Sequence, residues 1–530
     1  MSDIYNISRL IEAGRYEQAI EETRSLLGIT EALPKCDEKV ILFFNLAGFL
    51  VDIGAEQPNQ EAAEQGLELF TEHEEAMKRV VGDGQYFYNL GNAKSNFLSK
   101  ELMEPASFHT IEQLVEVKNI YWKAVKYWTD QGENCPPEYL VNLGNILKRQ
   151  YRLTEALSYY DLVLFSRADI PQAWLNRSET LVMLNRITTS YSIQMFEEVK
   201  KGFEAVVAST GLPPAWIPHY ERKAQYFEAL IEKELEECGI ERDADNDHRT
   251  QEEFSQLSPY RQFCLQKELV LSEHALYCPC AGSARDNLSI ITRSGLIGDF
   301  IIPMEMVLNR LKSEFSLARR LYYEYGDEDA SLELLHETCF TELYNDEVLG
   351  LDVEKLRTSF RLCFGMLDKI GVAICELLGV FPKGGDNIYF QNFWRLDTDG
   401  RRDLFEKHSC PSLLALYSIA TDLNSHKGGE WAFYKTWRND LEHKFVVVYK
   451  SDTLGDLFGS YKMLKEIIFI REDDFVNQLE HLLRLTRSAI FSFAYLVREK
   501  ALKETSGDSI TVPHFISPQD YVFDDSELSN

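Results

Sequence analysis

The sequence contains no run of about 20 consecutive apolar residues, the length that a helix needs to cross a lipid bilayer. Its first residues, MSDIYNISRLIEAGRYEQ, also lack the apolar core of a secretory signal peptide. The ten cysteines are scattered through 530 residues, a usage that fits reduced thiols in the cytosol. We therefore expect a cytoplasmic protein without a membrane segment.

Positive charge is also scarce. Lysine and arginine together number 55, against 85 aspartate and glutamate residues, which gives a net charge of −30. Proteins that bind nucleic acid broadly and without specificity present a basic surface, so this composition argues against that function. It leaves room for a small basic site on an acidic body.

Motifs for metals and nucleotides are equally sparse. Cys278-Pro279-Cys280 is the only close cysteine pair, and it has neither a second pair nor a histidine at ligand spacing, so we do not expect a zinc site. The stretches Lys383-Gly384-Gly385 and Lys427-Gly428-Gly429 have the pattern of loop turns and lack the spacing of a P-loop. We predict no cofactor, no metal ion and no nucleotide hydrolysis.

Apolar and aromatic residues, by contrast, are plentiful, at 45% and 12%. The length allows two to four domains, and helical periodicity dominates, so we predict an all-α protein. Its expected parts are a tetratricopeptide-like repeat domain, a charged linker, a helical bundle and an acidic tail expected to be disordered. They cover residues 1–240, 241–256, 257–505 and 506–530.

The repeat domain is predicted from two related stretches, FYNLGNA and YLVNLGNIL. In the second, Leu140 and Gly144 fill first-helix positions of a tetratricopeptide repeat, and Ala156 and Tyr160 supply the second-helix pair. Trp174 follows Leu140 by 34 residues, which is the period of this repeat. Because period and paired-helix pattern coincide, we prefer a right-handed solenoid to a generic helical bundle.

The repeat copies are imperfect. Leu90 and Leu143, which are equivalent in the two stretches, lie 53 residues apart. This distance exceeds one period, so we expect an insertion near residues Leu102–His109.

The second part contains five helical patterns with apolar faces. They cover Ile301–Tyr325, Leu356–Val380, Leu413–Leu423, Trp431–Val448 and Phe475–Lys503. Residues Phe445–Tyr449 are prone to form a strand, but one short run does not predict a sheet.

The helix expected at Trp431–Val448 carries the main candidate site. Its apolar face consists of Tyr434, Trp437, Leu441, Phe445 and Val448. Asn439 and His443 share a second face, and Arg438 points about 140° away from His443. Arginine binds the charge of a phosphodiester with a planar fork of donors, and histidine transfers protons near neutral pH.

An arginine followed within six residues by a histidine occurs three times, at Arg438/His443, Arg402/His408 and Arg242/His248. The last pair lies in an acidic run without an apolar stripe, and we discard it. The second pair directly precedes a predicted helix, and spacing alone does not exclude it.

Several segments between residues 260 and 503 resemble the HEPN superfamily of helical nucleases, in particular the subgroup that follows tetratricopeptide repeats in bacteria. The segments are YRQFCLQKELVLSE, EKLRTSFRLCFGMLDKIG, PSLLALYSIATDL, RNDLEH and HLLRLTRSAIFSFAYL. RNDLEH matches the superfamily's Arg-polar-x-x-x-His pattern and follows the expected helix, which favours the first of the three pairs. The sequence departs from the family at Ser272–Ala275, where an Asn-Pro pair is usual, and we assign that loop no role.

The resemblance implies a metal-independent endoribonuclease that acts as a HEPN homodimer, with the two motif helices facing each other across a cleft. The RNA 2′-hydroxyl would be the nucleophile. His443 would move its proton or protonate the leaving 5′-oxygen, Arg438 would hold the charge on the pentacovalent phosphate, and Asn439 would orient either partner. Such an enzyme would be a toxin or an anti-phage effector, with tRNA as one candidate substrate.

Structural interpretations of the same residues stay open. Arg438 could pair with Glu442 on the next turn, and His443 could be an ordinary boundary histidine. Asp368-Lys369 has the pattern of a structural pair that could also border the cleft. In the alternative function, both helical parts are non-catalytic scaffolds, which the acidic balance favours because it slows the approach of RNA.

We expect the repeat array to bind a protein partner or trigger, because such arrays present a long concave surface. Exposed acidic residues would suit a basic peptide or protein, namely Glu61, Glu64, Glu72, Glu74 and Glu75. In the alternative, the array only holds the HEPN pair together.

Overall fold

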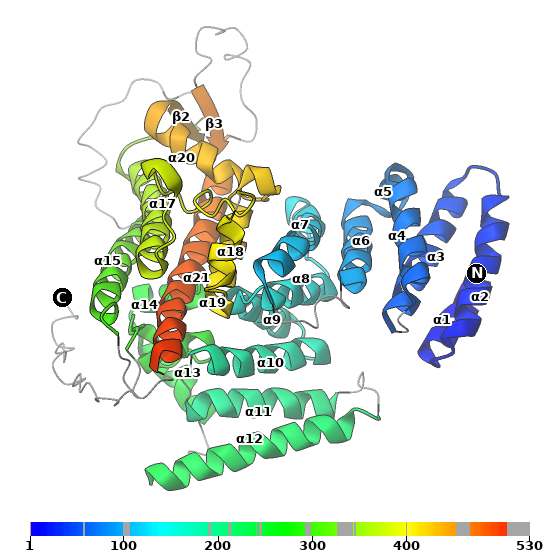
Figure 1. Cartoon of the computed structure of the whole chain (residues 1–530), viewed down its shortest axis with the longest axis horizontal. Helices are drawn as coiled ribbons and strands as arrows, with labels where there is room; N and C mark the ends of the chain where they lie inside the picture. The colour runs from blue at the N-terminus through cyan, green and yellow to red at the C-terminus, as the bar shows by residue number, and fades with distance from the viewer. Residues whose placement is uncertain are drawn as a thin grey trace.

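The computed structural model describes residues 2–56, 59–98, 106–188, 192–209, 214–239, 241–242, 246–291, 298–325, 343, 346–398, 400–451 and 467–505. Helices account for most of these residues (Figure 1), so the predicted all-α class is confirmed. Within this part of the chain, no helix combines the length and the apolar character that spanning a bilayer requires.

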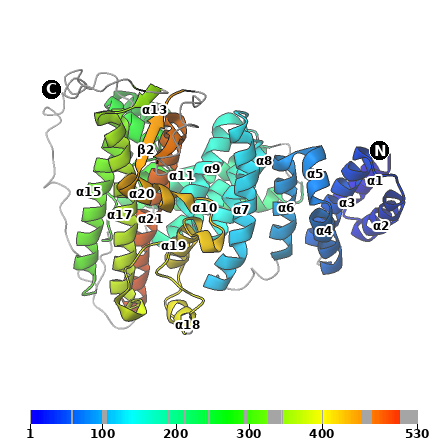
Figure 2. The same cartoon turned by 90° about the horizontal axis from the view of Figure 1, so that it is seen from above.

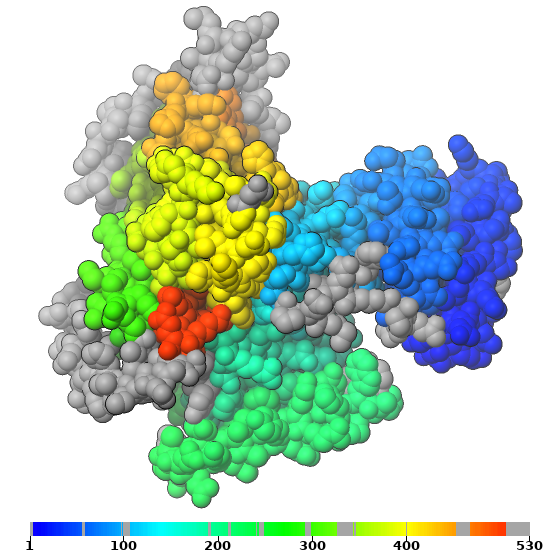
Figure 3. Space-filling view, in the orientation of Figure 1, coloured from blue at the N-terminus to red at the C-terminus, as the bar shows by residue number. Residues whose placement is uncertain are grey.

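The first half of the chain is a succession of helices that stack side by side (Figures 1 and 2). They are α1 (Ser2–Glu12), α2 (Tyr16–Glu31), α3 (Asp37–Glu56), α4 (Gln60–Glu72), α5 (Glu74–Val81), α6 (Asp83–Leu98), α7 (Phe108–Asp130), α8 (Pro137–Arg149), α9 (Leu153–Ser166), α10 (Pro171–Thr188), α11 (Ile193–Ala208) and α12 (Ile217–Cys238). The first six form an arm that stands out from the rest of the molecule (Figure 3).

Two helix pairs share the same local packing. Gly144 of α8 faces the ring of Tyr160 in α9, and Gly91 of α6 faces the ring of Tyr121 in α7. A Cβ atom at either glycine would stand 2.7 or 2.9 Å from that ring, so only glycine permits the approach. In both pairs the tyrosine hydroxyl donates to the asparagine after the glycine, at 2.8 and 2.6 Å. The two NLGN stretches are therefore equivalent in space.

The expected insertion falls between α6 and α7. Residues 99–105 lie outside the described residues, and α7 then begins at Phe108. The Phe108 ring is fully buried among Trp394, Phe405 and Tyr417, at centroid distances of 5.2 to 6.3 Å. The first turns of α7 therefore pack into the C-terminal part of the chain.

The C-terminal part is arranged around one long helix, α21 (Glu472–Thr505). The others are α13 (Asn246–Gln256), α14 (Pro259–Gln266), α15 (Ile301–Tyr325), α17 (Leu351–Leu378), α18 (Arg401–Glu406), α19 (Pro411–Asp422) and α20 (Phe433–His443), with short 3₁₀ turns η2 (His274–Leu276), η3 (Ala281–Ala284), η5 (Lys383–Gly385) and η6 (Ser425–Lys427). Helices α15, α17 and α19 all pack on α21.

A small sheet follows α20, which the sequence analysis did not expect. Strand β2 (Phe445–Tyr449) lies between β1 (Glu347–Val348), which is antiparallel to it, and β3 (Ile467–Arg471), which is parallel. Alternate residues Val446 and Val448 are buried. The β-branched run forms a strand because two segments remote in sequence supply partners, and one segment alone could not indicate that.

Buried apolar residues form three clusters, one of which is confined to residues 7–93. The second comprises residues 114–173. The largest joins residues between 108 and 231 to residues between 269 and 501, and so extends across the predicted linker. The linker segment, 241–256, includes α13, and the predicted tail, 506–530, lies outside the described residues.

Candidate active site

One face of α20 is anchored in the core. The Tyr434 hydroxyl donates to the side chain of Gln478 on α21 at 2.7 Å. Trp437 packs against the ring of Phe475 with centroids 5.7 Å apart, and Leu441 packs against the same core. The predicted apolar face is therefore confirmed along α20.

The predicted face is wrong for Phe445, because the helix ends at His443 and not at Val448. Phe445 opens β2 and exposes 70% of its surface, whereas Val448 is buried in the strand. Helical spacing does not apply beyond the end of the helix. A large apolar side chain consequently lies exposed two residues from His443.

Arg438 lies on the flank of α20 that faces α17. Its Nη1 donates to Oδ2 of Asp368 at 3.1 Å, and its guanidinium lies 5.6 Å from the centroid of the Phe364 ring. The side chain is still 29% exposed, so the guanidinium is held in place without being enclosed. The alternative pairing with Glu442 is absent, since Glu442 approaches Arg361 instead, at 3.7 Å.

Asp368 borders the site rather than pairing with its neighbour Lys369. Burial raises the pKa of the Asp368 carboxyl, although the backbone N–H of Phe390 and the charge of Arg438 act in the opposite direction. Lys369 pairs with Glu314 of α15 at 2.8 Å. The two adjacent residues therefore serve different contacts.

His443 and Asn439 are both exposed, one helical turn apart. Among the described residues, neither side chain has a hydrogen bond or an ion pair. Arg438 points to a different side of the helix, as its spacing predicts. A single chain thus offers an accessible imidazole on one side of α20 and a fixed guanidinium on another.

The sequence analysis did not single out a stripe of residues on α17. Arg357, Arg361, Phe364 and Asp368 recur at i, i+4, i+7 and i+11, which places them on one face of the helix. This face lies against α20 and β2, because Arg357 donates to the Val446 carbonyl and Asp368 binds the motif arginine. It brings two basic side chains beside the motif. The helical spacing of these polar residues could have indicated this face from the sequence.

The other arginine–histidine pairs make structural contacts. Arg402 of α18 pairs with Glu112 of α7 at 2.6 Å. Burial and nearby lysines lower the pKa of His408. Arg242 pairs with Glu228 of α12 at 2.7 Å. Neither pair lies on α20.

Helix α7 binds the loop that leads into α20. The Asn119 side chain donates to the Gly428 carbonyl at 2.8 Å. Trp122 packs edge-on against Trp431, with ring centroids 5.6 Å apart. A helix of the N-terminal stack therefore contacts the segment that precedes the motif helix.

A buried ion cluster lies where this loop begins. Asp422, the last residue of α19, pairs with Lys118 of α7 at 2.5 Å and with Arg152 at the start of α9. Burial raises the pKa of Asp422, but the charges of Arg152 and Lys118 outweigh burial and hold the pKa below its usual value. Because all three side chains are fully buried, removing one leaves uncompensated charge.

His481 of α21 packs against the same loop. Its ring lies 3.9 Å from that of Trp431, and its Nδ1 lies 3.0 Å from the Tyr434 hydroxyl. Burial lowers the pKa of His481 to about 3. The imidazole is therefore neutral near pH 7 and serves as packing surface for Trp431.

Residues 298–500 match the model of the LA2681-like HEPN family. No curated protein is significantly similar to the chain. The matched range contains α17, α19 and α20, and so includes the helix that carries Arg438 and His443. Together with the helical architecture, this match identifies the C-terminal part of the chain as a HEPN domain.

Proposed function

We propose that this protein is a metal-independent endoribonuclease whose HEPN domain cuts RNA with Arg438, His443 and Asn439. The observation that carries the proposal is the arrangement on α20: an exposed histidine and asparagine one turn apart, and an arginine fixed on the adjacent flank. A biological role as a toxin or anti-phage effector, with tRNA as substrate, is part of the same proposal.

The chemistry follows from these side chains. The 2′-hydroxyl attacks the neighbouring phosphorus, the P–O5′ bond breaks, and a 2′,3′-cyclic phosphate and a free 5′-hydroxyl result. His443 takes the 2′ proton or supplies one to the 5′-oxygen. Arg438 stabilises the charge on the pentacovalent phosphate, and Asn439 orients the histidine or the phosphate.

Asp368 fixes the orientation of the Arg438 guanidinium. The guanidinium has five N–H donors in a planar fork, and the pair with Asp368 uses Nη1. The remaining edge can bind phosphate oxygens while Asp368 and the Phe364 ring hold the group in one rotamer. Asp368 thereby acts as a positioning residue.

We propose that the enzyme is a homodimer through the HEPN domain. One chain supplies a single arginine and a single histidine that point to different sides of α20, so a second copy completes the set. The exposed Phe445 beside His443 supports an apolar contact at this place.

The repeat array would couple a protein partner to the site through α7. Its contacts with Gly428, Trp431 and Asp422 lie on the segment directly before the motif helix. Four of the acidic residues expected to bind a basic partner are exposed on the N-terminal arm, namely Glu61, Glu64, Glu72 and Glu75. Deleting residues 1–81 retains α7; constitutive cleavage would support restraint by the array, and unchanged activity would remove the arm as sensor.

One observation favours the alternative function, a non-catalytic scaffold. Arg438 already has a carboxylate partner in Asp368, which lowers its attraction for phosphate. In that case Arg438 and His443 would be dispensable for anything the protein does to RNA.

The test is cleavage of bulk tRNA by purified full-length protein and matched variants. Arg438→Ala is expected to lower the rate about 10²–10³-fold, and His443→Ala about 10²–10⁴-fold. Lys435→Ala is the matched control, since Lys435 is an exposed cation on the same helix. Full activity of either site variant, with an unchanged circular dichroism spectrum, would contradict the site.

Mixing the two inactive variants tests the composite site. If the arginine of one chain acts with the histidine of the other, co-refolded Arg438→Ala and His443→Ala chains regain activity in the mixed dimer. A mixture that stays inactive despite forming mixed dimers would contradict a site shared in this way.

A further inference from the structure

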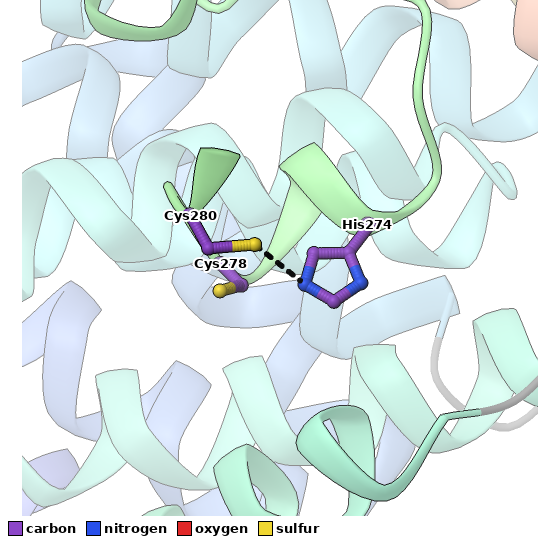
Figure 4. A group of neighbouring side chains, drawn as sticks. All are labelled: His274, Cys278 and Cys280. Atoms are coloured by element: carbon purple, nitrogen blue, oxygen red, sulfur yellow. Dashed lines mark hydrogen bonds between the residues drawn. The ribbon is translucent and has the colours of Figure 1, made fainter. Parts of the chain in front are cut away.

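The loop between α14 and α15 brings together three side chains that the sequence analysis had separated. His274, Cys278 and Cys280 each offer one ligand atom, and these atoms all lie within 4.8 Å of one another (Figure 4). The Cys280 sulfur lies 3.3 Å from Nε2 of His274. The expectation that this cysteine pair lacks a histidine at ligand distance is therefore wrong, because His274 precedes Cys278 by one turn of η2.

The backbone holds these three residues in place. The N–H groups of Tyr277 and Cys278 both donate to the His274 carbonyl, at 3.2 and 3.0 Å, and that of Ser283 donates to the Cys280 carbonyl at 3.1 Å. The first bonds fix the histidine relative to Cys278, and the last fixes the turn after Cys280. The ligand atoms are thus presented by two closed turns and not by a free loop.

Neighbouring elements also anchor the loop. The Tyr277 hydroxyl lies 2.8 Å from the hydroxyl of Ser192, which caps α11. Glu273 pairs with Arg498 of α21 at 2.5 Å, and Glu253 of α13 accepts from the Ala281 N–H at 3.0 Å. The loop therefore lies where α11, α13 and α21 meet.

We propose that His274, Cys278 and Cys280 bind one zinc ion. Two thiolates and an imidazole are soft and borderline donors, the set that selects zinc over magnesium or calcium. The three side chains are partly buried, and three protein ligands leave the fourth position of a tetrahedral site to another donor. A water molecule completes the tetrahedral coordination that zinc prefers.

The zinc would act at a distance from the nuclease site. The loop contacts α21 at Arg498, whereas α20 contacts α21 at Gln478. At 1.5 Å per residue these positions are about 30 Å apart along the helix. The ion would hold the two turns of this loop together where α11, α13 and α21 meet, and it would take no part in RNA cleavage.

The first test measures zinc in full-length protein by mass spectrometry after incubation with zinc and desalting. One equivalent is expected for the wild type and for Cys238→Ser, an exposed cysteine outside the loop. Cys280→Ser and His274→Asn should lose affinity by more than the roughly 10–100-fold that an outer-shell change costs. Wild-type protein that retains no zinc, or variants that retain the full equivalent, would overturn the proposal.

Cobalt substitution gives a readout that does not depend on the folding of a variant. Wild-type protein loaded with Co²⁺ should show thiolate-to-cobalt charge-transfer absorption, because two cysteines bind the ion. Absence of this absorption, or isolation of the protein with a Cys278–Cys280 disulfide, would contradict the site.

Discussion

The two halves of the N-terminal helical stack, α1–α6 and α7–α12, differ in what they pack against. Helices α1–α6 share a buried apolar cluster confined to residues 7–93, and α6 in addition packs on α7. Helices α7 and α9–α12 contribute to one core with the HEPN domain, from Phe108 to Ala501. Helices of one stack thus form a projecting arm in one half and part of the core of the HEPN domain in the other.

The difference shows that structural units need not follow the order of the chain. An extension of α7 inserts Phe108 among aromatic rings of the HEPN part, and Lys118 and Arg152 complete a buried ion cluster around Asp422. The half that contacts the segment leading into α20 is therefore the one that shares a core with the HEPN domain.

The largest difference between α1–α6 and α7–α12 is expected from truncation. Deleting residues 1–81 removes α1–α5 and should leave a soluble, folded remainder, because α6 still covers α7 and repeat arrays depend mainly on neighbouring contacts. Deleting residues 1–240 removes part of the HEPN core and should yield insoluble protein. The solubility and the circular dichroism spectra of the two truncated proteins test this expectation. Two equally well-folded products would contradict a core shared by α7–α12 and the HEPN domain.

Asp422→Ala should cost about 3–5 kcal/mol of unfolding free energy, because it leaves Lys118 buried without a counter-charge, while Arg152 keeps its pair with Glu155. The measurement is urea unfolding followed by tryptophan fluorescence, since Trp122 and Trp431 lie beside the cluster.

The matched control for that cluster lies in the arm. Asp37 pairs with Arg79 at 3.1 Å, and both side chains are more than two-thirds exposed. Asp37→Ala should therefore cost no more than about 1 kcal/mol. Equal losses of unfolding free energy from the two aspartate substitutions would mean that the buried cluster does not stabilise the packing of α7 and α9 on α19.

A smaller effect is expected from pH. The pKa of His481 is lowered to about 3 by burial, below the roughly 6.5 of an unfolded histidine. The unfolded state therefore takes up the proton first, so stability is full above about pH 6.5 and falls as pH decreases. Between pH 7 and pH 5 the loss is up to about 2 kcal/mol.

His481→Asn keeps a polar side chain near the Tyr434 hydroxyl but does not titrate in this range, so the stability of this variant should depend less on pH. Urea unfolding at pH 7 and pH 5 measures the difference between variant and wild type. The same pH dependence in both proteins would show that His481 is not responsible.

The sequence predicted those features that local pattern determines. The apolar stripe of α20 and the placement of Asn439 and His443 on one face follow from spacing within a single helix. The two NLGN stretches likewise predicted helix pairs, because a glycine at that position allows a tyrosine ring to approach.

Features that depend on remote partners were beyond the sequence. Asp368 could not be assigned to Arg438 because the two residues lie on different helices, 70 positions apart. The strand at Phe445–Tyr449 needed β1 and β3, and the role of α7 needed the HEPN core around Phe108. Each of these requires the folded arrangement.

Analysis of the RNA ends tests the central proposal most directly. Full-length protein, incubated briefly with tRNA in EDTA, should produce fragments with 2′,3′-cyclic phosphate and 5′-hydroxyl ends, and Arg438→Ala should not. Cleavage that requires magnesium and leaves 5′-phosphate ends, or no cleavage by protein shown to be folded and dimeric, would contradict a metal-independent HEPN nuclease.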